Sequence, residues 1–152
     1  MMNKKIWFDM DGTFVDLYGV TDWLPDLIAC NPRPYAVAKP LVNLSQFAKI
    51  IHKLQAVGYS VGIVSWLAKN PSEDYEIVVT ETKLAWLQKH LPSVEFDEIK
   101  ILRYGTKKSC VGNGYLFDDE QQNRDEWQDI AFDEKNLIAS LYGILRNAEL
   151  LA

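Results

Sequence analysis

Short apolar runs and helical repeats alternate along most of the chain. Apolar residues dominate 5–10 and 59–66, which predicts two buried strands, and 43–58 between them carries apolar side chains at helical spacing. Asn43 and Gln46 indicate a capping box at the start of that helix. The first part of the chain therefore predicts a strand, a helix and a second strand.

The alternation continues toward the end of the chain. A long helix is expected over 72–91, with Ser72 as its cap. The elements expected after it are a strand at 99–104, a strand at 114–119, a short polar helix, a strand at 129–133 and a helix over about 134–150. Strands that alternate with helices predict an α/β fold, in which a mostly parallel sheet is covered by helices on both faces.

Residues 14–42 break this alternation. They hold four of the six prolines, which predicts an insertion that leaves the sheet after the first strand and contains one short helix over 21–29. Because a chain of 152 residues can bury a substantial core, we expect residues 1–152 to form a single domain that includes this insertion.

Charge and composition limit the partners. A net charge of −5 argues against extended nucleic-acid binding, since that affinity comes largely from lysine and arginine. We expect no membrane partner, because no stretch approaches about 20 apolar residues, and the simplest location is the cytoplasm. Cys30 and Cys110 lack metal-site spacing and are expected to be reduced thiols. The oligomeric state stays open.

Four aspartates follow two of the predicted strands. Asp9 and Asp11 come at the end of the first strand, and Asp118 and Asp119 end the strand at 114–119. An isolated pair of this kind is more often a solvated loop or a helix cap. In this fold, however, ligands bind at the carboxyl ends of the strands, so neighbouring strands would bring the four acids together. Such a cluster predicts a hard divalent cation with oxygen ligands, most readily Mg²⁺.

A hydroxyl and two lysines are expected at the same edge of the sheet. Ser65 ends the strand 59–66, and Lys107 and Lys108 follow the strand 99–104. Each alone is typical of a turn or of a solvated surface. Together with the acids they predict an anion site beside a metal. The string GTKKS lacks the leading glycine and spacer of a P-loop.

These residues resemble a known family. FDMDGT after an apolar strand, Ser65 at the end of another, a lysine downstream and FDD at the end of a third are similar to the haloacid dehalogenase (HAD) superfamily of phosphotransferases. The resemblance spans the chain apart from 14–42. It implies a Rossmann-like three-layer core with a small cap insertion after the first strand, and a Mg²⁺-dependent phosphatase that hydrolyses phosphomonoesters through an aspartyl-phosphate.

The resemblance also implies catalytic roles. Asp9 would be the nucleophile that attacks phosphorus, and Asp11 would be the general acid and then the general base. Thr13 and Ser65 would hold phosphate oxygens. Mg²⁺ would bind the Asp9 carboxylate and the Asp11 carbonyl together with the pair that ends the strand at 114–119. In that pair Asp118 is the expected ligand, and Asp119 is a ligand or a neighbour of one.

A narrower resemblance points to one branch of this superfamily. ETKLAWLQKHLP, RYGTKKS and LFDDE are similar to 5′(3′)-deoxyribonucleotidases, and the ten residues between Lys108 and Asp118 favour Lys108 over Lys107 as the cation. Lys83 is expected either to contact substrate phosphate or to be a surface helix residue. The segment 14–42 is shorter than the cap of those enzymes.

The aromatic residues divide into two groups. Trp66 directly follows Ser65 and is expected to line the pocket and to stack on a ring of the substrate. Trp7, Trp86 and Trp127 are expected to pack in the core.

Three functions remain open from the sequence. The first is hydrolysis of a small phosphorylated metabolite such as a (deoxy)nucleoside monophosphate. The second is a phosphatase acting on polynucleotide ends or another large partner, and the third is a non-catalytic module that binds metal or phosphate.

Overall fold

A parallel five-stranded sheet forms the centre of the computed structural model, which describes residues 4–69 and 72–151. Its strands lie in the order β5-β4-β1-β6-β7 and all pair in parallel. Their bounds are β1 Lys5–Phe8, β4 Ser60–Trp66, β5 Glu98–Leu102, β6 Tyr115–Phe117 and β7 Ala131–Phe132. The central strand β1 lies between β4 and β6, so the two strands that the acids follow are neighbours, as the convergence of the acids requires.

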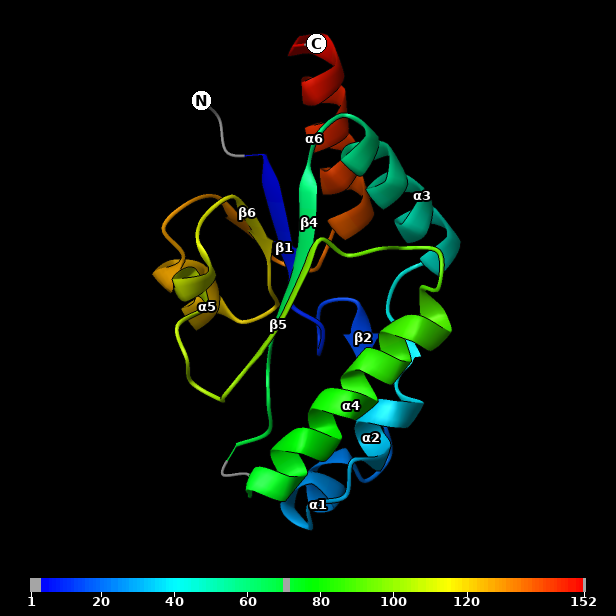
Figure 1. The fold of residues 1–152 in the computed structure, drawn as a ribbon, viewed down its shortest axis with the longest axis vertical. Coiled ribbons are helices and arrows are strands. Elements are labelled where there is room, and N and C mark those ends of the chain that lie inside the picture. The colour runs from blue at the N-terminus through cyan, green and yellow to red at the C-terminus, as the bar shows by residue number, and fades with distance from the viewer. Residues whose placement is uncertain (1–3, 70–71, 152) are drawn as a thin grey trace.

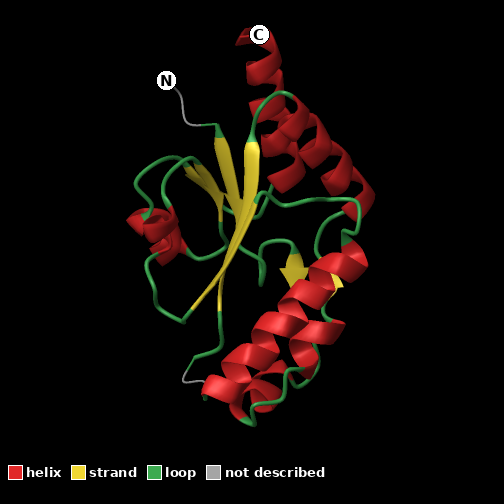
Figure 2. Cartoon of the chain, in the orientation of Figure 1, coloured by secondary structure: helices red, strands yellow, loops and turns green. Residues whose placement is uncertain are grey.

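Helices cover both faces of this sheet. They are α3 (Leu44–Ala56), α4 (Glu73–His90), α5 (Gln121–Glu126) and α6 (Leu137–Leu151), with a 3₁₀ turn, η1, at Lys108–Val111. Figure 1 shows α3 and α6 on one side of the sheet and α5 on the other, and Figure 2 shows the strands between them. The predicted α/β fold with a Rossmann-like three-layer arrangement is confirmed.

The strands alternate between two apolar layers. In β1, Ile6 and Phe8 pack in the large core with residues of α3 and α6, while Trp7 packs in a smaller cluster with Leu116 and Trp127 on the opposite face. This period of two is what a strand covered on both faces requires. Trp7 and Trp127, together with Trp86 of α4, are buried as predicted.

Side-chain caps begin the two long helices where the sequence predicts them. The side chain of Asn43 accepts a hydrogen bond from the Gln46 amide at 3.0 Å, and the Ser72 hydroxyl accepts one from the Tyr75 amide at 3.2 Å. Each cap satisfies an amide that has no partner within the first turn of its helix.

Residues 14–42 contain more structure than predicted. They form β2 (Val15–Asp16), α1 (Trp23–Ile28), α2 (Arg33–Val37) and β3 (Lys39–Pro40). The expected helix over 21–29 is α1. The sequence missed α2 because prolines surround it, although proline is compatible with a first helical turn, and it missed β2 and β3 because each has only two residues.

Contacts hold this segment against α4. Helix α2 packs on α4, and the Trp86 indole nitrogen donates to the Ala38 carbonyl oxygen at 2.8 Å. The rings of Phe14 and Trp86 lie 5.9 Å apart. The segment is therefore fixed to the same helix that carries Lys83.

The strands are shorter than predicted at the end where the acids lie. β1 ends at Phe8 rather than at 10, and β6 ends at Phe117 rather than at 119. The acids therefore follow the strands instead of occupying their last positions, which leaves their side chains free to turn toward one another.

Two further expectations concern the cysteines and membrane-spanning helices. Cys30 and Cys110 are both exposed and free of disulfides in the structure. Of the helices in the described part of the chain, none combines the length and the apolar character needed to cross a bilayer.

Gly114→Ala should destabilise the fold. Gly114 has φ of 112°, and a Cβ there would lie 2.5 Å from the Lys5 carbonyl oxygen at the start of the central strand. We expect the free energy of unfolding to fall by about 2 kcal/mol or more, measured by urea titration of tryptophan fluorescence.

Gly143→Ala is the matched control for this prediction. Gly143 lies in α6, with open space around the position of a Cβ. Alanine there should raise the free energy of unfolding by about 0.5–1 kcal/mol because glycine is a weak helix former. Equal effects of the two substitutions would contradict the close packing at Gly114.

Candidate functional site

The loop after β1 places two aspartates at the centre of the sheet edge. The Asp9 amide donates to the Phe117 carbonyl oxygen at 2.9 Å, which continues the pairing of β1 with β6 by one residue. The chain then turns so tightly that the amides of Thr13, Phe14 and Val15 all donate to the Met10 carbonyl oxygen. Asp9 and Asp11 therefore leave the sheet at its carboxyl edge.

Gly12 makes this turn possible. Its φ of 83° is strained for any residue with a Cβ, and a Cβ at this position would overlap the Asp119 carboxylate. Glycine at position 12 thus allows the loop after β1 to approach the loop after β6.

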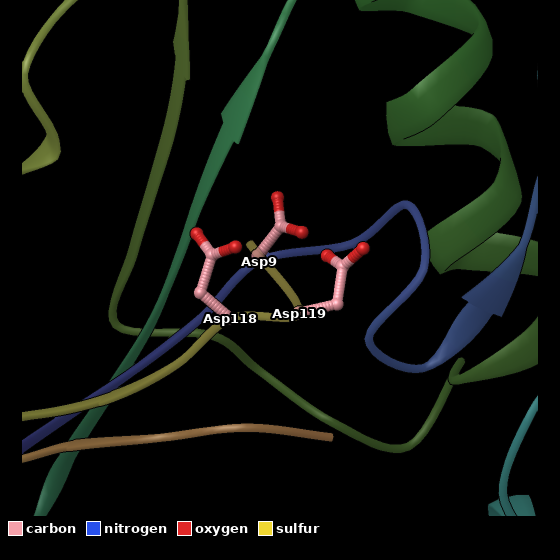
Figure 3. A group of neighbouring side chains, drawn as sticks. All are labelled: Asp9, Asp118 and Asp119. Atoms are coloured by element: carbon pink, nitrogen blue, oxygen red, sulfur yellow. The ribbon is translucent and has the colours of Figure 1, made fainter. Parts of the chain in front are cut away.

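Three carboxylates meet above the ends of β1 and β6. Asp9, Asp118 and Asp119 each offer an oxygen that lies within 4.8 Å of the other two, and Figure 3 shows the three side chains on the same side of the backbone. Burial and the charge of Asp9 raise the pKa of Asp118 to about 6 and that of Asp119 to about 8. Negative charges this close favour the protonated forms of the acids, and a divalent cation among them would favour the ionised forms.

The residues present at this cluster fit a hard divalent cation. The three carboxylates supply oxygen ligands of the kind that Mg²⁺ prefers. Asn123 is buried beside them, where its Nδ2 donates to Asp118 Oδ2 at 3.2 Å. Its Oδ1 is buried and has no hydrogen-bond partner among the described residues, so it is available to a bound ion or to that ion's water. Sequence reasoning missed Asn123, which lies in the short polar helix α5.

Lys108 bridges two of the acids. Its Nζ lies 2.8 Å from Asp9 Oδ1 and 2.7 Å from Asp118 Oδ2, and the side chain is buried. Burial alone would lower the pKa of Lys108, but the charges of Asp9 and Asp118 outweigh it and raise the pKa. Lys107 is exposed. Lys108 rather than Lys107 therefore lies among the acids, and its contact with phosphate stays a prediction.

Lys83 reaches the site from α4. Its side chain is 1% exposed, and its Nζ donates to Asp11 Oδ2 at 2.8 Å, to Ser65 Oγ at 2.8 Å and to the Trp66 carbonyl oxygen at 2.7 Å. The alternative that Lys83 is a surface helix residue is wrong. Since these three acceptors match the three ammonium protons, a contact between Lys83 and phosphate stays a prediction.

Asp11 therefore differs from the other acids in its partner. Its carboxylate faces Lys83 and lies outside the group of three, so only its carbonyl could serve the predicted metal in this arrangement. Burial raises the pKa of Asp11, and the Lys83 charge opposes that rise.

Two predicted phosphate ligands are buried beside the acids. The Thr13 hydroxyl donates to Asp9 Oδ2 at 3.1 Å and accepts from the Asp119 amide at 3.2 Å. The Ser65 hydroxyl accepts from Lys83. Neither is among the described residues that line the adjacent cavity, so their contacts with phosphate stay predictions.

A cavity of about 390 Å³ opens beside these groups. Asp9, Asp11 and Lys108 line one end of it, and Trp66 lines its wall as predicted. Its other described lining residues come from 14–42, from the chain after β4 and β5, and from the start of α5: Leu17, Tyr18, Trp23, Leu24, Leu27, Ile28, Tyr35, Leu67, Ala68, Lys69, Tyr104, Glu120 and Asn123. The sequence did not indicate Tyr104 or Glu120, because nothing in the pattern near either residue distinguishes a cavity wall from an ordinary loop.

The fold and the site together define a class of protein. It is a doubly wound α/β protein with an acidic and lysine-containing cluster at the carboxyl edge of its central strand. The chain matches no family model, no curated protein and no solved structure in comparisons with known proteins. Membership of the HAD superfamily is therefore a hypothesis carried by the motifs and by this geometry.

Asp119→Asn should change how stability depends on pH in metal-free protein. Between the ordinary pKa of 3.8 and the folded value of about 8, the folded wild type holds a proton that the unfolded chain has lost. The free energy of unfolding contributed by Asp119 therefore falls as pH rises through that range. We therefore expect the melting temperature of the variant, relative to that of wild type, to increase as the pH rises from about 5 to about 8. Both proteins are measured with a chelator present.

Asp125→Asn is the control, because Asp125 is an exposed acid of α5. Its melting temperature, relative to that of wild type, should not change with pH over this range. Adding Mg²⁺ at the higher pH should stabilise wild type more than Asp119→Asn, because binding to the folded state raises its stability. A difference between wild type and Asp119→Asn that does not vary with pH would contradict the assigned pKa.

Lys83→Met should destabilise the protein because it places an apolar side chain in a buried position and leaves the partly buried Asp11 carboxylate without its cation. We expect the free energy of unfolding to fall by about 3 kcal/mol, measured by urea titration. Lys89→Met changes an exposed lysine of the same helix and should have little effect. A loss of stability that is the same for both variants would show that the Lys83 contacts contribute nothing specific.

Proposed function

We propose that this protein is a Mg²⁺-dependent phosphomonoester hydrolase of the HAD type that acts on a small phosphorylated metabolite, such as a (deoxy)nucleoside monophosphate. The observation that carries the proposal is the placement of Asp9 and Asp11. Both follow the central strand and line one cavity, yet they contact different lysines, Lys108 and Lys83. Two acids in one site with different partners support two different chemical roles.

Asp9 is the nucleophile in this proposal. An oxygen of its carboxylate forms a bond to phosphorus while the bond from phosphorus to the ester oxygen breaks, which gives an aspartyl-phosphate and an alcohol. Lys108 and Thr13 hold the carboxylate through one hydrogen bond to each oxygen. This leaves little rotational freedom to be lost when the substrate arrives.

Asp11 is the proton donor and then the proton acceptor. In the first step its carboxyl proton goes to the departing ester oxygen. In the second step it takes a proton from the water that attacks phosphorus, and the bond between phosphorus and Asp9 breaks to release inorganic phosphate. Burial raises the pKa of Asp11, which is the direction that favours a proton donor over an ordinary aspartate.

Positive charge stabilises the transferring phosphoryl group. Lys108 lies against the nucleophile and lines the cavity, so its ammonium group faces the negative charge that develops there. Mg²⁺, held by Asp9, Asp118 and Asp119 with Asn123 nearby, would supply further neutralisation of the phosphate oxygens.

The cavity supports a small substrate. Its volume of about 390 Å³ falls in the range of pockets that bind metabolites and cofactors. Residues of α1 form part of its wall and so limit the space open to a substrate beside Asp9.

Phosphate release tests the proposal. Wild-type protein with Mg²⁺ should release inorganic phosphate from at least one member of a panel of 5′- and 3′-nucleotides, sugar phosphates and aryl phosphates. Asp9→Asn should lower kcat by about a thousandfold or more, because the amide is a poor nucleophile. Removing the divalent ion with a chelator should abolish turnover, and Mg²⁺ should restore it.

Asp16→Asn is a control. Asp16 follows the loop that carries Asp9 and lies in β2, where it accepts a hydrogen bond from the Gly19 amide and does not contact the site. It should retain wild-type kcat. If wild type with Mg²⁺ released no phosphate from any substrate of the panel, the hydrolase proposal would be wrong. If Asp9→Asn retained wild-type turnover, the assigned nucleophile would be wrong.

A further inference from the structure

Helix α1 exposes apolar side chains that its own packing does not explain. All six of its residues are at least partly exposed, and Leu24 and Ile28 are 50% and 75% exposed. Leu24, Leu27 and Ile28 nevertheless share one helical face, since they are spaced by three and four residues, and all three line the cavity that contains Asp9. Leu27 also packs against a buried cluster that includes Leu17 and Tyr35, whereas the exposed Leu24 and Ile28 serve this face as cavity wall.

A second apolar wall comes from the last residue of β4 and from the chain after β4 and β5. Trp66 and Tyr104 lie there with ring centroids 5.0 Å apart, and Leu67 and Ala68 continue the surface. The Trp66 indole nitrogen donates to the Thr106 carbonyl oxygen at 2.8 Å, which fixes the orientation of the ring.

The apolar wall adjoins the end of the cavity where phosphate would bind. Lys108 Nζ lies 5.3 Å from the centroid of the Trp66 ring and 2.8 Å from Asp9. A phosphate beside Lys108 therefore places the rest of its ester between the two walls. We call this space the apolar slot and define it by Leu24, Leu27, Ile28, Trp66 and Tyr104.

Polar groups are unevenly distributed around the cavity. Asp9, Asp11, Lys108, Glu120 and Asn123 belong to the acidic and lysine-containing end. Tyr18 and Tyr35 also border that end, close to Gly12 and to Lys83, and away from it the charged lining residue among those described is Lys69. A leaving group with many hydroxyls would lose hydrogen bonds to water against the apolar walls, and each hydroxyl buried without a partner lowers affinity.

We propose that the apolar slot binds a flat aromatic leaving group, so that the enzyme selects aromatic phosphomonoesters over phosphates of sugars and other polyols. This inference rests on the hydrolase function proposed above and assigns its substrate class. Flat rings fit between walls that offer side-chain contact and few hydrogen bonds, and ring stacking on Trp66 adds to that contact.

Matched substrates test the selection. A nucleoside 5′-monophosphate and ribose 5-phosphate carry phosphate on the same kind of carbon and differ by the aromatic ring. Benzyl phosphate and glycerol phosphate form a second pair without a nucleobase. We expect kcat/KM of wild type to be about tenfold or more higher for the aromatic member of each pair. Equal values within the pairs, with phosphate released from all four, would overturn the slot and leave the hydrolase function intact.

Substitutions on α1 test whether this helix is responsible for the preference for aromatic substrates. The double variant Leu24→Ser with Ile28→Ser changes exposed side chains, so the fold should persist. It should lower kcat/KM for benzyl phosphate by about tenfold and leave that for glycerol phosphate within about twofold. The control is Val37→Ser with Leu41→Ser, two exposed apolar residues outside the described cavity lining. If both double variants changed the two substrates equally, the assignment of α1 would be wrong.

A binding measurement separates failure of the slot from failure of the hydrolase. If wild type hydrolyses nothing, the hydrolase function falls, and calorimetric titration of Asp9→Asn protein with benzyl phosphate and with glycerol phosphate tests the slot directly. Benzyl phosphate should bind about tenfold more tightly, and the α1 double substitution should remove that difference. Equal binding of the two ligands, or binding of neither, would overturn the slot.

Discussion

The site depends on the balance of charge between four buried or half-buried carboxylates and two buried lysines. Lys108 lies between Asp9 and Asp118, and Lys83 holds Asp11. No lysine of the described chain contacts Asp119. When all these groups are ionised, four negative charges face two positive charges, and one divalent cation would balance the difference. Burial raises the pKa of Asp119, the charge of Asp9 raises it further, and no lysine in the described chain contacts Asp119 to oppose the rise.

This balance makes two similar residues chemically different. Asp9 is fixed by Lys108 and Thr13 beside the other acids, while Asp11 turns away from them toward Lys83 on α4. The difference originates in the loop, because the Asp9 amide still pairs with β6 whereas Asp11 forms a bridge with Val15 inside the loop. A nucleophile has to stay ionised and an acid has to carry a proton, so a single loop that supplies both needs such separation.

The sequence predicted the parts of the site that follow apolar strands. The acids after β1 and β6, and Ser65 at the end of β4, could be placed because parallel strands bring their carboxyl ends to one edge. The position of Lys83 could not be decided, since apolar residues are spread around α4 and leave no single buried face from which to judge its orientation. The two short strands β2 and β3 and the helix α2 depend on contacts with α4 and with each other, which local sequence does not show.

The segment 14–42 connects the acids to the cavity wall. Tyr18 lies close to Gly12, and the Tyr35 ring lies 5.1 Å from Lys83 Nζ, so these residues border the loop after β1 and the lysine that contacts Asp11. The same segment continues into α1, whose apolar face lines the far part of the cavity. The acids and lysines are anchored by the sheet and by α4, whereas the exposed side chains of α1 contribute little to the core. Substitutions on α1 should therefore change the apolar wall of the cavity without disturbing the charge balance at the acids. In the proposed hydrolase, this physical separation would let one arrangement of acids serve different substrates.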